Sequence, residues 1–588
     1  MIKTLLRHVK QYKKPALLTP TFAALEVVME VLIPFVTAML IDKGIQAGNM
    51  AEILKYGGLM LVLALVSLYC GVVCGRYAAT ASSGFAGNLR DAMYTNIQTF
   101  SFSNIDKFST AGLITRMTTD VNNLQMAFSM CIRIAVRAPM TLISSMVMCF
   151  VIDRQLSLIF LGAMVVLAAA LITISRKAMK LFSETFRKYD DLNASVQENI
   201  SAIRVVKAFV REDHESEKFG KAANNLYRLF VKAESIIAFN GPVMMLVVYT
   251  CIILLSWFGA QFIVGSTLTT GELTSLFSYV MTALGSLMML SMIFVMLTMS
   301  MASGRRICEV LDEKADLTNP ENPVMEVRDG SIDFDNVSFT YKTGEGDPTL
   351  RHIDLHIRSG ETVGIIGGTG SGKSSLVNLI SRLYDVSEGA VKVGGIDVRQ
   401  YDMEALRNQV AVVLQKNVLF SGTILENLRW GKEDATLEEC REACAQACAT
   451  EFIERMPDGY NTHIEQGGTN VSGGQKQRLC IARALMKKPR VLILDDSTSA
   501  VDTATDAKIR EAFAKRIPGT TKLIIAQRIS SVQHADRILV LEDGCVNGFD
   551  THENLLATNE IYREIYETQT QGGGDFDEPT PDGEEAAK

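Results

Sequence analysis

The chain has 588 residues, of which 48% are hydrophobic and 21% are charged, and its formal net charge is −7. A chain of this length is too long for one ordinary domain, so at least two domains are expected. The acidic balance argues against a nucleic-acid partner, because nucleic-acid-binding domains usually carry a basic patch. Eleven cysteines are scattered along the sequence without the spacing of a disulfide framework.

Long apolar runs are concentrated in the first half of the chain, whereas residues after about 325 read as an ordinary soluble domain. A helix needs about 20 mostly apolar residues to cross the hydrocarbon core of a bilayer. Six stretches meet this requirement, near 16–41, 56–80, 132–152, 156–175, 236–264 and 273–303. Before them, residues 1–15 place apolar side chains opposite lysines and an arginine, which predicts an elbow helix on the membrane surface rather than a signal peptide.

The distribution of basic residues predicts the orientation of these spans. Residues 1–15 and the connection between the fourth and fifth spans are rich in lysine and arginine. The short connections contain few basic residues; they lie near 42–55, 153–155 and 265–272. Because basic loops stay on the cytoplasmic side, we expect both termini in the cytoplasm and the six spans among the lipids of the cell membrane.

The two long cytoplasmic connections, about 81–131 and 176–235, interleave polar and apolar residues as helices do. The spans are therefore expected to continue as helices well beyond the membrane. The sequence suggests that the chain turns back near 110–120 and 193–206. These tips would carry motion between the soluble domain and the spans, because long connections in compact proteins usually serve a function. The alternative is that they are simple connecting loops.

A glycine-rich run from Gly367 to Ser374 matches the pattern G-x-x-x-x-G-K-S. It follows an apolar strand at 362–366 and precedes a helix at 375–383, which is the context that a phosphate-binding loop requires. Backbone N–H groups of such a loop surround phosphates, and the helix N-terminus adds favourable partial charge. The residues expected to hold ATP here are Gly367, Gly368, Thr369, Gly370, Ser371, Gly372, Lys373, Ser374 and Ser375.

Asp495 ends an apolar run, 490–495, that reads as a buried strand. Its carboxylate is suited to hold Mg²⁺ through water, and the Ser374 hydroxyl is suited to bind the same ion. Lys373 would neutralise oxygens of the β- and γ-phosphates. The sequence therefore predicts ATP and Mg²⁺ as cofactors.

The pentad Val471–Gln475 (VSGGQ) lies between these two motifs and resembles the signature of ATP-binding-cassette (ABC) proteins, which other P-loop nucleotide hydrolases lack. The remaining family motifs follow in order. Tyr341 resembles the aromatic residue that stacks on adenine, Gln415 the catalytic lid glutamine that reaches Mg²⁺, Glu465 the acidic residue near the signature, and Ser499–Asp502 the loop that contacts the partner domain.

The resemblance covers essentially the whole chain, because six spans before one cassette is the arrangement of type IV half-exporters. It implies a six-span α-helical transmembrane domain with long cytoplasmic helical extensions, followed by an α/β P-loop ATPase domain. The expected segments are an elbow helix at 1–15, the transmembrane domain at 16–308, a polar linker at 309–327, the cassette at 328–570 and a disordered acidic tail at 571–588.

In this family two cassettes enclose two ATP molecules, and each site combines the phosphate loop of one chain with the signature of the other. The resemblance therefore implies that this chain's signature residues contact ATP bound to a partner chain. These residues are Ser472, Gly473, Gly474 and Gln475.

Two positions depart from the family pattern, and both are positions where the family's residues take part in ATP hydrolysis. Asp496 stands where a catalytic glutamate is expected, and Gln527 stands at the switch position that is normally histidine. The shorter carboxylate is withdrawn by about one bond, and a misplacement of about 1 Å can cost about 10²-fold in rate. Glutamine cannot carry a positive charge. The chain resembles the degenerate-site subunit of heterodimeric bacterial multidrug exporters, which implies slow hydrolysis here and a partner half-transporter with intact catalytic residues.

The sequence leaves the substrate open. Export of drug-like amphipathic or hydrophobic small molecules is favoured. A lipid or peptide exporter or flippase has the same architecture, and an ATP-gated regulatory subunit is a third alternative.

Two smaller features also leave alternatives. Glu26 and Glu30 lie one turn apart in the first span, where charge is costly, so they bind a cation, pair with another residue or face a water-filled cavity. Cys440, Cys444 and Cys448 share one helical face, which indicates a buried helix face rather than a metal site.

Overall fold

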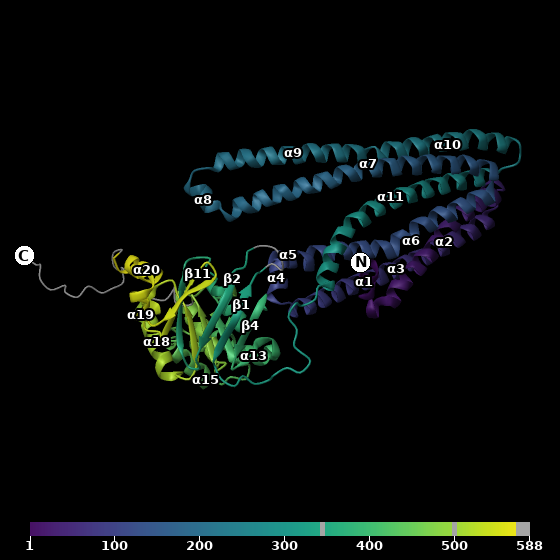
Figure 1. Ribbon diagram of the computed structural model, residues 1–588. Coiled ribbons are helices and arrows are strands. Elements are labelled where there is room, and N and C mark those ends of the chain that lie inside the picture. The colour runs from purple at the N-terminus through teal and green to yellow at the C-terminus, as the bar shows by residue number, and fades with distance from the viewer. Residues whose placement is uncertain (342–346, 497–502, 572–588) are drawn as a thin grey trace, which may run out of the picture. The chain divides into compact units, whose positions relative to one another are not determined.

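The structure is a computed structural model that describes residues 1–341, 347–496 and 503–571. They form two compact units (Figure 1). The first comprises Met1–Thr99 and Phe108–Lys314, and the second comprises Phe100–Lys107 and the chain from Ala315 onward. The predicted acidic tail and the predicted partner-contacting loop Ser499–Asp502 lie outside the described residues.

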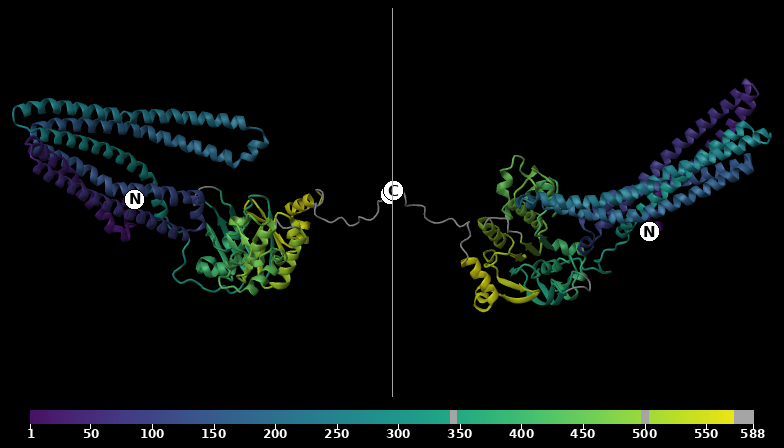
Figure 2. Two further views of the ribbon diagram at one scale, coloured as in Figure 1. Left: turned by 180° about the vertical axis from the view of Figure 1, so that it is seen from behind. Right: turned by 90° about the horizontal axis from the view of Figure 1, so that it is seen from above.

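The first unit is a bundle of long helices (Figure 2). Its elements are α1 (Ile2–Arg7), η1 (Lys10–Tyr12), α2 (Lys13–Met39), the π-helix η2 (Leu40–Gln46), α3 (Met50–Gln98), α5 (Thr110–Thr115), the π-helix η3 (Arg116–Asp120), α6 (Val121–Ile152), α7 (Arg154–Ser201), α8 (Ile203–Ala208), α9 (Glu212–Ala238), α10 (Asn240–Val264) and α11 (Thr270–Asp312). Six helical segments of the described chain are long and apolar enough to cross a membrane, which confirms the six predicted spans.

The helices of this unit are much longer than a membrane is thick. Helix α3 has 49 residues and α7 has 48. At 1.5 Å per residue each is about 70 Å long, whereas the hydrocarbon core measures about 30 Å. More than half of each helix therefore extends beyond the hydrocarbon, as the sequence predicted.

The first long connection turns back earlier than the sequence suggested. The prediction of a tip at 110–120 was wrong, because these residues form α5 and η3, and buried Asp120 accepts a 2.7 Å hydrogen bond from Arg306 Nε. The chain reverses around the short helix α4 (Phe102–Phe108) instead, and Ser109 follows with φ +53°. The second connection reverses at 202–211, which overlaps the predicted tip at 193–206.

The second unit contains a six-stranded sheet in the order β12-β11-β3-β10-β9-β6, a four-stranded antiparallel sheet in the order β2-β1-β4-β5, and the pair β7-β8. The strands are β1 (Ile332–Phe339), β2 (Leu350–Ile357), β3 (Thr362–Gly367), β4 (Glu388–Val393), β5 (Ile396–Asp397), β6 (Val410–Val413), β7 (Gly422–Thr423), β8 (His463–Ile464), β9 (Val491–Asp495), β10 (Thr521–Ile525), β11 (Arg537–Glu542) and β12 (Cys545–Asp550). In the larger sheet β12 runs antiparallel and its other strands run parallel.

The helices of this unit are α4, α12 (Lys373–Ile380), α13 (Met403–Gln409), α14 (Ile424–Arg429), α15 (Leu437–Gln446), α16 (Thr450–Glu454), α17 (Gly473–Leu485), α18 (Thr503–Arg516), α19 (His552–Thr558) and α20 (Glu560–Gln571). Short 3-10 turns are η4 (Val398–Gln400), η5 (Gly459–Asn461), η6 (Gln466–Gly468) and η7 (Ile529–Ser531). One apolar core lies between the larger sheet and α15 and α17, and a second joins that sheet to the smaller one. Cys440 and Cys444 of α15 are fully buried in the first core, which supports the helix-face interpretation.

Candidate functional site

The residues of the predicted nucleotide site gather at one edge of the six-stranded sheet. Strands β3, β10, β9 and β6 run parallel, and Ile525 of β10 pairs with both Ile365 and Asp495. The carboxyl ends of parallel strands meet at one edge, where open α/β sheets bind ligands. The phosphate loop leaves this edge after β3, Gln415 after β6, and Gln527 after β10.

The loop between β3 and α12 has a conformation suited to holding phosphates. Gly372 has φ +94°, and a Cβ at this position would lie 2.7 Å from the Leu350 side chain, so a larger residue would be both strained and blocked. The Lys373 ammonium donates hydrogen bonds to the carbonyls of Gly367 (2.9 Å) and Gly368 (2.7 Å). The ammonium group thus lies against the loop that is predicted to hold the ATP phosphates, whose charge Lys373 is predicted to neutralise.

Ser374 and Asp495 supply two oxygen ligands side by side. The Ser374 hydroxyl donates to the Asp495 carboxylate over 3.1 Å, and Asp495 is 5% exposed. Burial raises the pKa of Asp495 above its ordinary value; the charge of Asp496 acts in the same direction, and the bond from Ser374 opposes it. Burial also lowers the pKa of Lys373, against the attraction of the two aspartates. Hydroxyl and carboxylate oxygens fit Mg²⁺.

The two residues that depart from the family pattern contact each other. Gln527 Nε2 donates to Asp496 Oδ2 over 2.9 Å. Asp496 has φ +48°, a left-handed conformation that aspartate adopts more readily than most residues. Its carbonyl also accepts a 3.4 Å hydrogen bond from Gln477. The predicted catalytic carboxylate is therefore bonded to a neutral amide rather than to an imidazole.

An aromatic cluster connects the predicted adenine side of the site with α4. Tyr341 shares a 2.8 Å hydrogen bond with Ser375 and meets the ring of Tyr384 edge-on at 5.1 Å. The Tyr384 hydroxyl in turn donates to Asp106 over 2.7 Å, and its ring meets Phe102 edge-on at 6.0 Å. Tyr384 could not be predicted from sequence, because a lone tyrosine in the turn after the phosphate-loop helix belongs to none of the motifs above.

The signature residues lie at the start of helix α17. Ser472 is its N-cap and forms a capping box with Gln475. The backbone N–H of Gln475 donates to Ser472 Oγ (3.3 Å), and the backbone N–H of Ser472 donates to Gln475 Oε1 (3.0 Å). Ser472 and Gly473 are exposed. An exposed N-terminus of a 13-residue helix attracts anions.

Two further predicted residues occupy the periphery. Gln415 lies in an exposed segment after β6. Within the described residues, it forms no hydrogen bond with Ser374 or Asp495, the two predicted Mg²⁺ ligands. Glu465 precedes the signature and accepts a 2.8 Å hydrogen bond from Thr469. The structure thus brings together the phosphate loop, Asp495, Asp496 and Gln527, whereas Gln415 remains at the edge.

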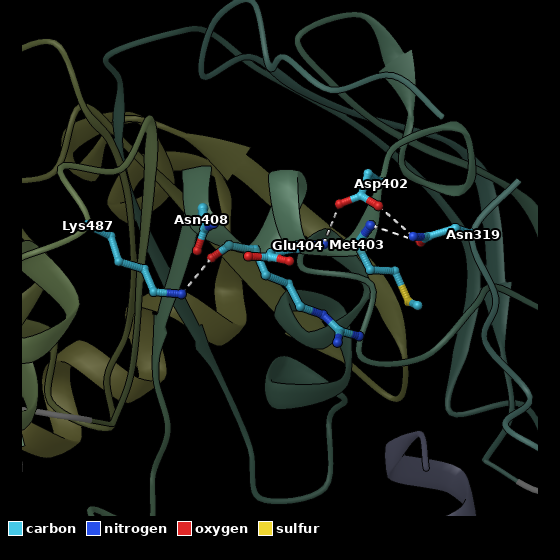
Figure 3. Close-up of a pocket in the computed structure, with 7 residues that line it drawn as sticks. Asn319, Asp402, Met403, Glu404, Asn408 and Lys487 are labelled. Carbon is cyan, nitrogen blue, oxygen red and sulfur yellow. Dashed lines mark hydrogen bonds between the residues drawn. The ribbon is translucent and has the colours of Figure 1, made fainter. Parts of the chain in front are cut away.

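A hollow of about 410 Å³ lies elsewhere on the second unit (Figure 3). It is lined by Asn319, Asp402, Met403, Glu404, Arg407, Asn408 and Lys487. Its polar groups bond one another: Lys487 donates to the Arg407 carbonyl (3.1 Å), and the Met403 amide donates to Asn319 (3.0 Å). Burial and the charge of Arg407 lower the pKa of Lys487. These bonds occupy part of the polar lining, and the hollow shares no residue with the nucleotide site.

The membrane unit contains an ionic triad, of which only the two glutamates were predicted from sequence. Arg137 of α6 donates from Nη1 to Glu26 Oε1 (2.9 Å) and from Nη2 to Glu30 Oε2 (2.9 Å), both on α2. The two glutamates are therefore paired, one of the three alternatives for them. The missed signal was Arg133 and Arg137, spaced by one helical turn at the start of an apolar span.

Comparisons with known proteins agree with this arrangement. Residues 17–287 match the ABC transporter transmembrane region, and residues 350–499 match the ABC transporter domain. The uncharacterized ABC transporter ATP-binding protein YfiB of Bacillus subtilis (strain 168) is 37% identical over 544 residues, which cover 92% of this chain and 94% of that protein. The ATP-dependent lipid A-core flippase of Syntrophus aciditrophicus (strain SB) is 33% identical over 524 residues, which cover 88% and 86%.

A solved structure described as a bacterial Atm1-family ABC exporter with ATP bound shares the fold. The TM-score is 0.79, the match covers 97% of this chain and 99% of that chain, and 23% of the residues are identical. This likeness confirms the predicted fold class of six helical spans followed by an ATPase domain, and the closer relatives in sequence establish the family. The chain belongs to the ABC transporter family and carries a transmembrane domain and an ABC ATPase domain in one polypeptide.

Proposed function

We propose that this chain is one half of a heterodimeric exporter that uses ATP to move amphipathic or hydrophobic, drug-like compounds across the cell membrane. Its own nucleotide site binds ATP and hydrolyses it slowly. Its signature, Ser472 to Gln475, completes a faster site on a partner chain that has the usual glutamate and histidine. The termini lie in the cytoplasm, as the basic N-terminal segment favours.

The observation that carries this proposal is the bond between Asp496 and Gln527. In a hydrolytic site the carboxylate orients the attacking water and the switch residue contacts the γ-phosphate. Here the carboxylate is one methylene shorter, and its partner is an amide that cannot become a cation. Both changes fall on the hydrolytic step. The groups that would bind ATP and Mg²⁺, namely Lys373, Ser374 and Asp495, keep the identities of the family pattern, and Ser374 lies beside Asp495.

ATP and Mg²⁺ fit the residues present. Buried Asp495, whose pKa is raised first by burial, lacks a cationic hydrogen-bond partner in the described part of the chain. A divalent ion beside Ser374 and Asp495 would offset the cost of keeping this carboxylate ionised. When bound, the ion would screen the charge of the phosphates. Lys373 would contribute a further positive charge, and the backbone of the glycine-rich loop would orient the phosphate chain.

A partner chain is supported by exposed apolar residues at the second cytoplasmic tip. Val205, Phe209 and Val210, in and after α8, are 56%, 73% and 81% exposed. Apolar side chains grouped at the turn between two long helices favour contact with another protein surface. We assign that surface to the cassette of the partner half-transporter, so that each chain's motion reaches the other's spans.

The decisive experiment is an ATPase measurement on the purified chain, alone and with its partner, in lipid nanodiscs. The chain alone is expected to bind ATP with very low turnover, and the pair is expected to hydrolyse it rapidly. A Ser472→Ala variant of this chain should slow the pair, since the signature acts on the partner's ATP. Rapid turnover by the chain alone, at the rate of the pair, would refute the heterodimer.

A lipid exporter or flippase is the second candidate, and the 33% identity to a lipid A-core flippase favours it specifically. An ATP-gated regulatory subunit is a third. Stimulation of the pair's ATPase by drugs but not by lipids supports drug export, and the reverse result supports the lipid function. ATP-dependent dye movement into inverted vesicles separates both kinds of transport from regulation.

A further inference from the structure

Helix α20 contacts the segment that carries the switch residue Gln527. Gln569 Nε2 donates to the Gln527 carbonyl over 2.9 Å, and the Ile529 amide donates to Gln569 Oε1 over 2.8 Å. One side chain therefore binds the backbone at two points, two residues apart. Ile529 opens the turn η7, and the first N–H groups of a helical turn lack partners within it. Gln569 supplies such a partner.

Helix α20 is fixed before it reaches Gln569. Tyr562 is fully buried, its hydroxyl shares a 2.7 Å hydrogen bond with His552 Nδ1, and its amide donates to Asn559 Oδ1 over 2.9 Å. The ring of Tyr566 also meets His552 edge-on at 5.5 Å. Tyr562, Tyr566 and Gln569 are spaced by four and three residues, so they lie on one face of the helix. Gln569 is thus presented from an anchored face.

The switch segment depends on contacts of this kind, because it has left the sheet. The Ala526 amide still donates to the Ile365 carbonyl over 3.3 Å, next to the end of β10. Beyond it, the Gln527 side chain points to Asp496, and the Gln527 backbone is held by Gln569. A shift of this backbone would move the Gln527 amide relative to the nucleotide.

We propose that Gln569 is a positioning residue for the switch, and that through Gln527 it sets how strongly this site distinguishes ATP from ADP. The chemistry recognised is the terminal phosphate of a nucleoside triphosphate. Gln569 touches no reacting atom itself. The inference rests on the proposed function, in which Gln527 contacts the γ-phosphate.

The informative variant is Gln569→Met, which keeps the length of the side chain and removes both hydrogen bonds. We expect it to weaken Mg-ATP binding about fivefold, the size expected from the loss of one or two ordinary hydrogen bonds. Mg-ADP binding should stay unchanged, because ADP has no γ-phosphate. Glu567→Gln is the matched control, since Glu567 is exposed on the same helix two residues earlier.

The experiment measures the Kd of Mg-ATP and Mg-ADP by calorimetry on the full chain in nanodiscs, in the natural and the Gln527→Ala backgrounds. If Gln569 acts through Gln527, its substitution has no further effect once Gln527 is alanine. Equal weakening of ATP and ADP, the same loss in both backgrounds, or no loss would overturn the proposal.

Two readouts keep the outcomes distinct. The unfolding temperature of the Gln569→Met variant should match that of the control; a lower temperature with parallel loss of both nucleotides would show a purely structural role and overturn the proposal. If Gln527→Ala alone leaves ATP binding unchanged, the assigned role of Gln527 fails. If Gln527→Ala weakens ATP binding and Gln569→Met does not, the positioning role of Gln569 alone fails.

Discussion

Two carboxylate centres of this chain have partners of different kinds. In the membrane unit a guanidinium, Arg137, pairs with Glu26 and Glu30 at 2.9 Å each. At the nucleotide site Asp496 receives a hydrogen bond from the neutral amide of Gln527. A guanidinium compensates a buried negative charge, whereas an amide only donates a hydrogen bond. In the membrane centre the cation bonds both carboxylates directly, whereas at the nucleotide centre Lys373 attracts the two aspartates and its ammonium bonds the carbonyls of Gly367 and Gly368.

The different partners predict how each centre responds to the loss of a charged side chain. The side chain of Glu26 is 12% exposed in the triad, so solvent screens its charge only weakly. Removing its counter-charge therefore strands a carboxylate in a membrane helix. At the nucleotide site Asp496 bonds the Gln527 amide, and the two aspartates are attracted by Lys373 rather than bonded to a guanidinium. Substitution should affect folding at the first centre and chemistry at the second.

The largest expected effect is that of Arg137→Met. It removes the guanidinium that Glu26 and Glu30 share, and we expect a loss of up to about 3 kcal/mol of folding stability, because Glu26 is nearly buried whereas Glu30 is 42% exposed. The measurement is the unfolding temperature and the folded yield of the chain in detergent. A variant as stable as the natural chain would contradict the structural role of the triad.

A matched control separates lost charge from lost packing. The triple variant Glu26→Gln, Glu30→Gln, Arg137→Met removes all three charges, and it should recover most of the stability, because replacing a whole buried ion pair by neutral residues is often nearly neutral. If the triple variant stays as unstable as the single one, packing of the arginine stem rather than charge compensation stabilises this part of the bundle.

The two centres were also unequally predictable from sequence. The nucleotide site follows from a local motif, since Gly367–Ser374 specifies its own loop and helix, and parallel strands bring Asp495 and Gln527 to the same edge. The triad depends on the packing of α2 against α6, which no local pattern encodes. The same limit explains the misplaced first tip: the helical pattern at 81–131 is nearly continuous, and the structure interrupts it only by short breaks at 99–101 and at Ser109.

A second prediction concerns the chemistry of the nucleotide centre. The double variant Asp496→Glu, Gln527→His restores the carboxylate reach and the imidazole of the family pattern. Within the assembled pair it should raise hydrolysis at this chain's site by up to about 10²-fold, the size that a misplacement of about 1 Å can cost. The measurement is ATP turnover in a pair whose other site is inactivated at its own phosphate-loop lysine. An unchanged rate would show that another feature keeps this site slow.

The smallest effect is on stability against pH, and it tests whether burial outweighs the attraction of Lys373 at Asp495. Burial raises the pKa of Asp495, so the folded unit favours the protonated acid. The stability that this gives is complete below the ordinary aspartate pKa of about 4 and is lost as the pH rises through the raised value.

An Asp495→Asn variant has no charge to bury. Without nucleotide it should therefore unfold at a higher temperature than the natural chain at pH 7.5, and the difference should shrink as the pH approaches 4. Mg-ATP should reverse the ranking, because the amide offers Mg²⁺ no negative charge. A difference that is independent of pH would mean that Asp495 is already compensated within the chain, and the contrast with the triad would then disappear.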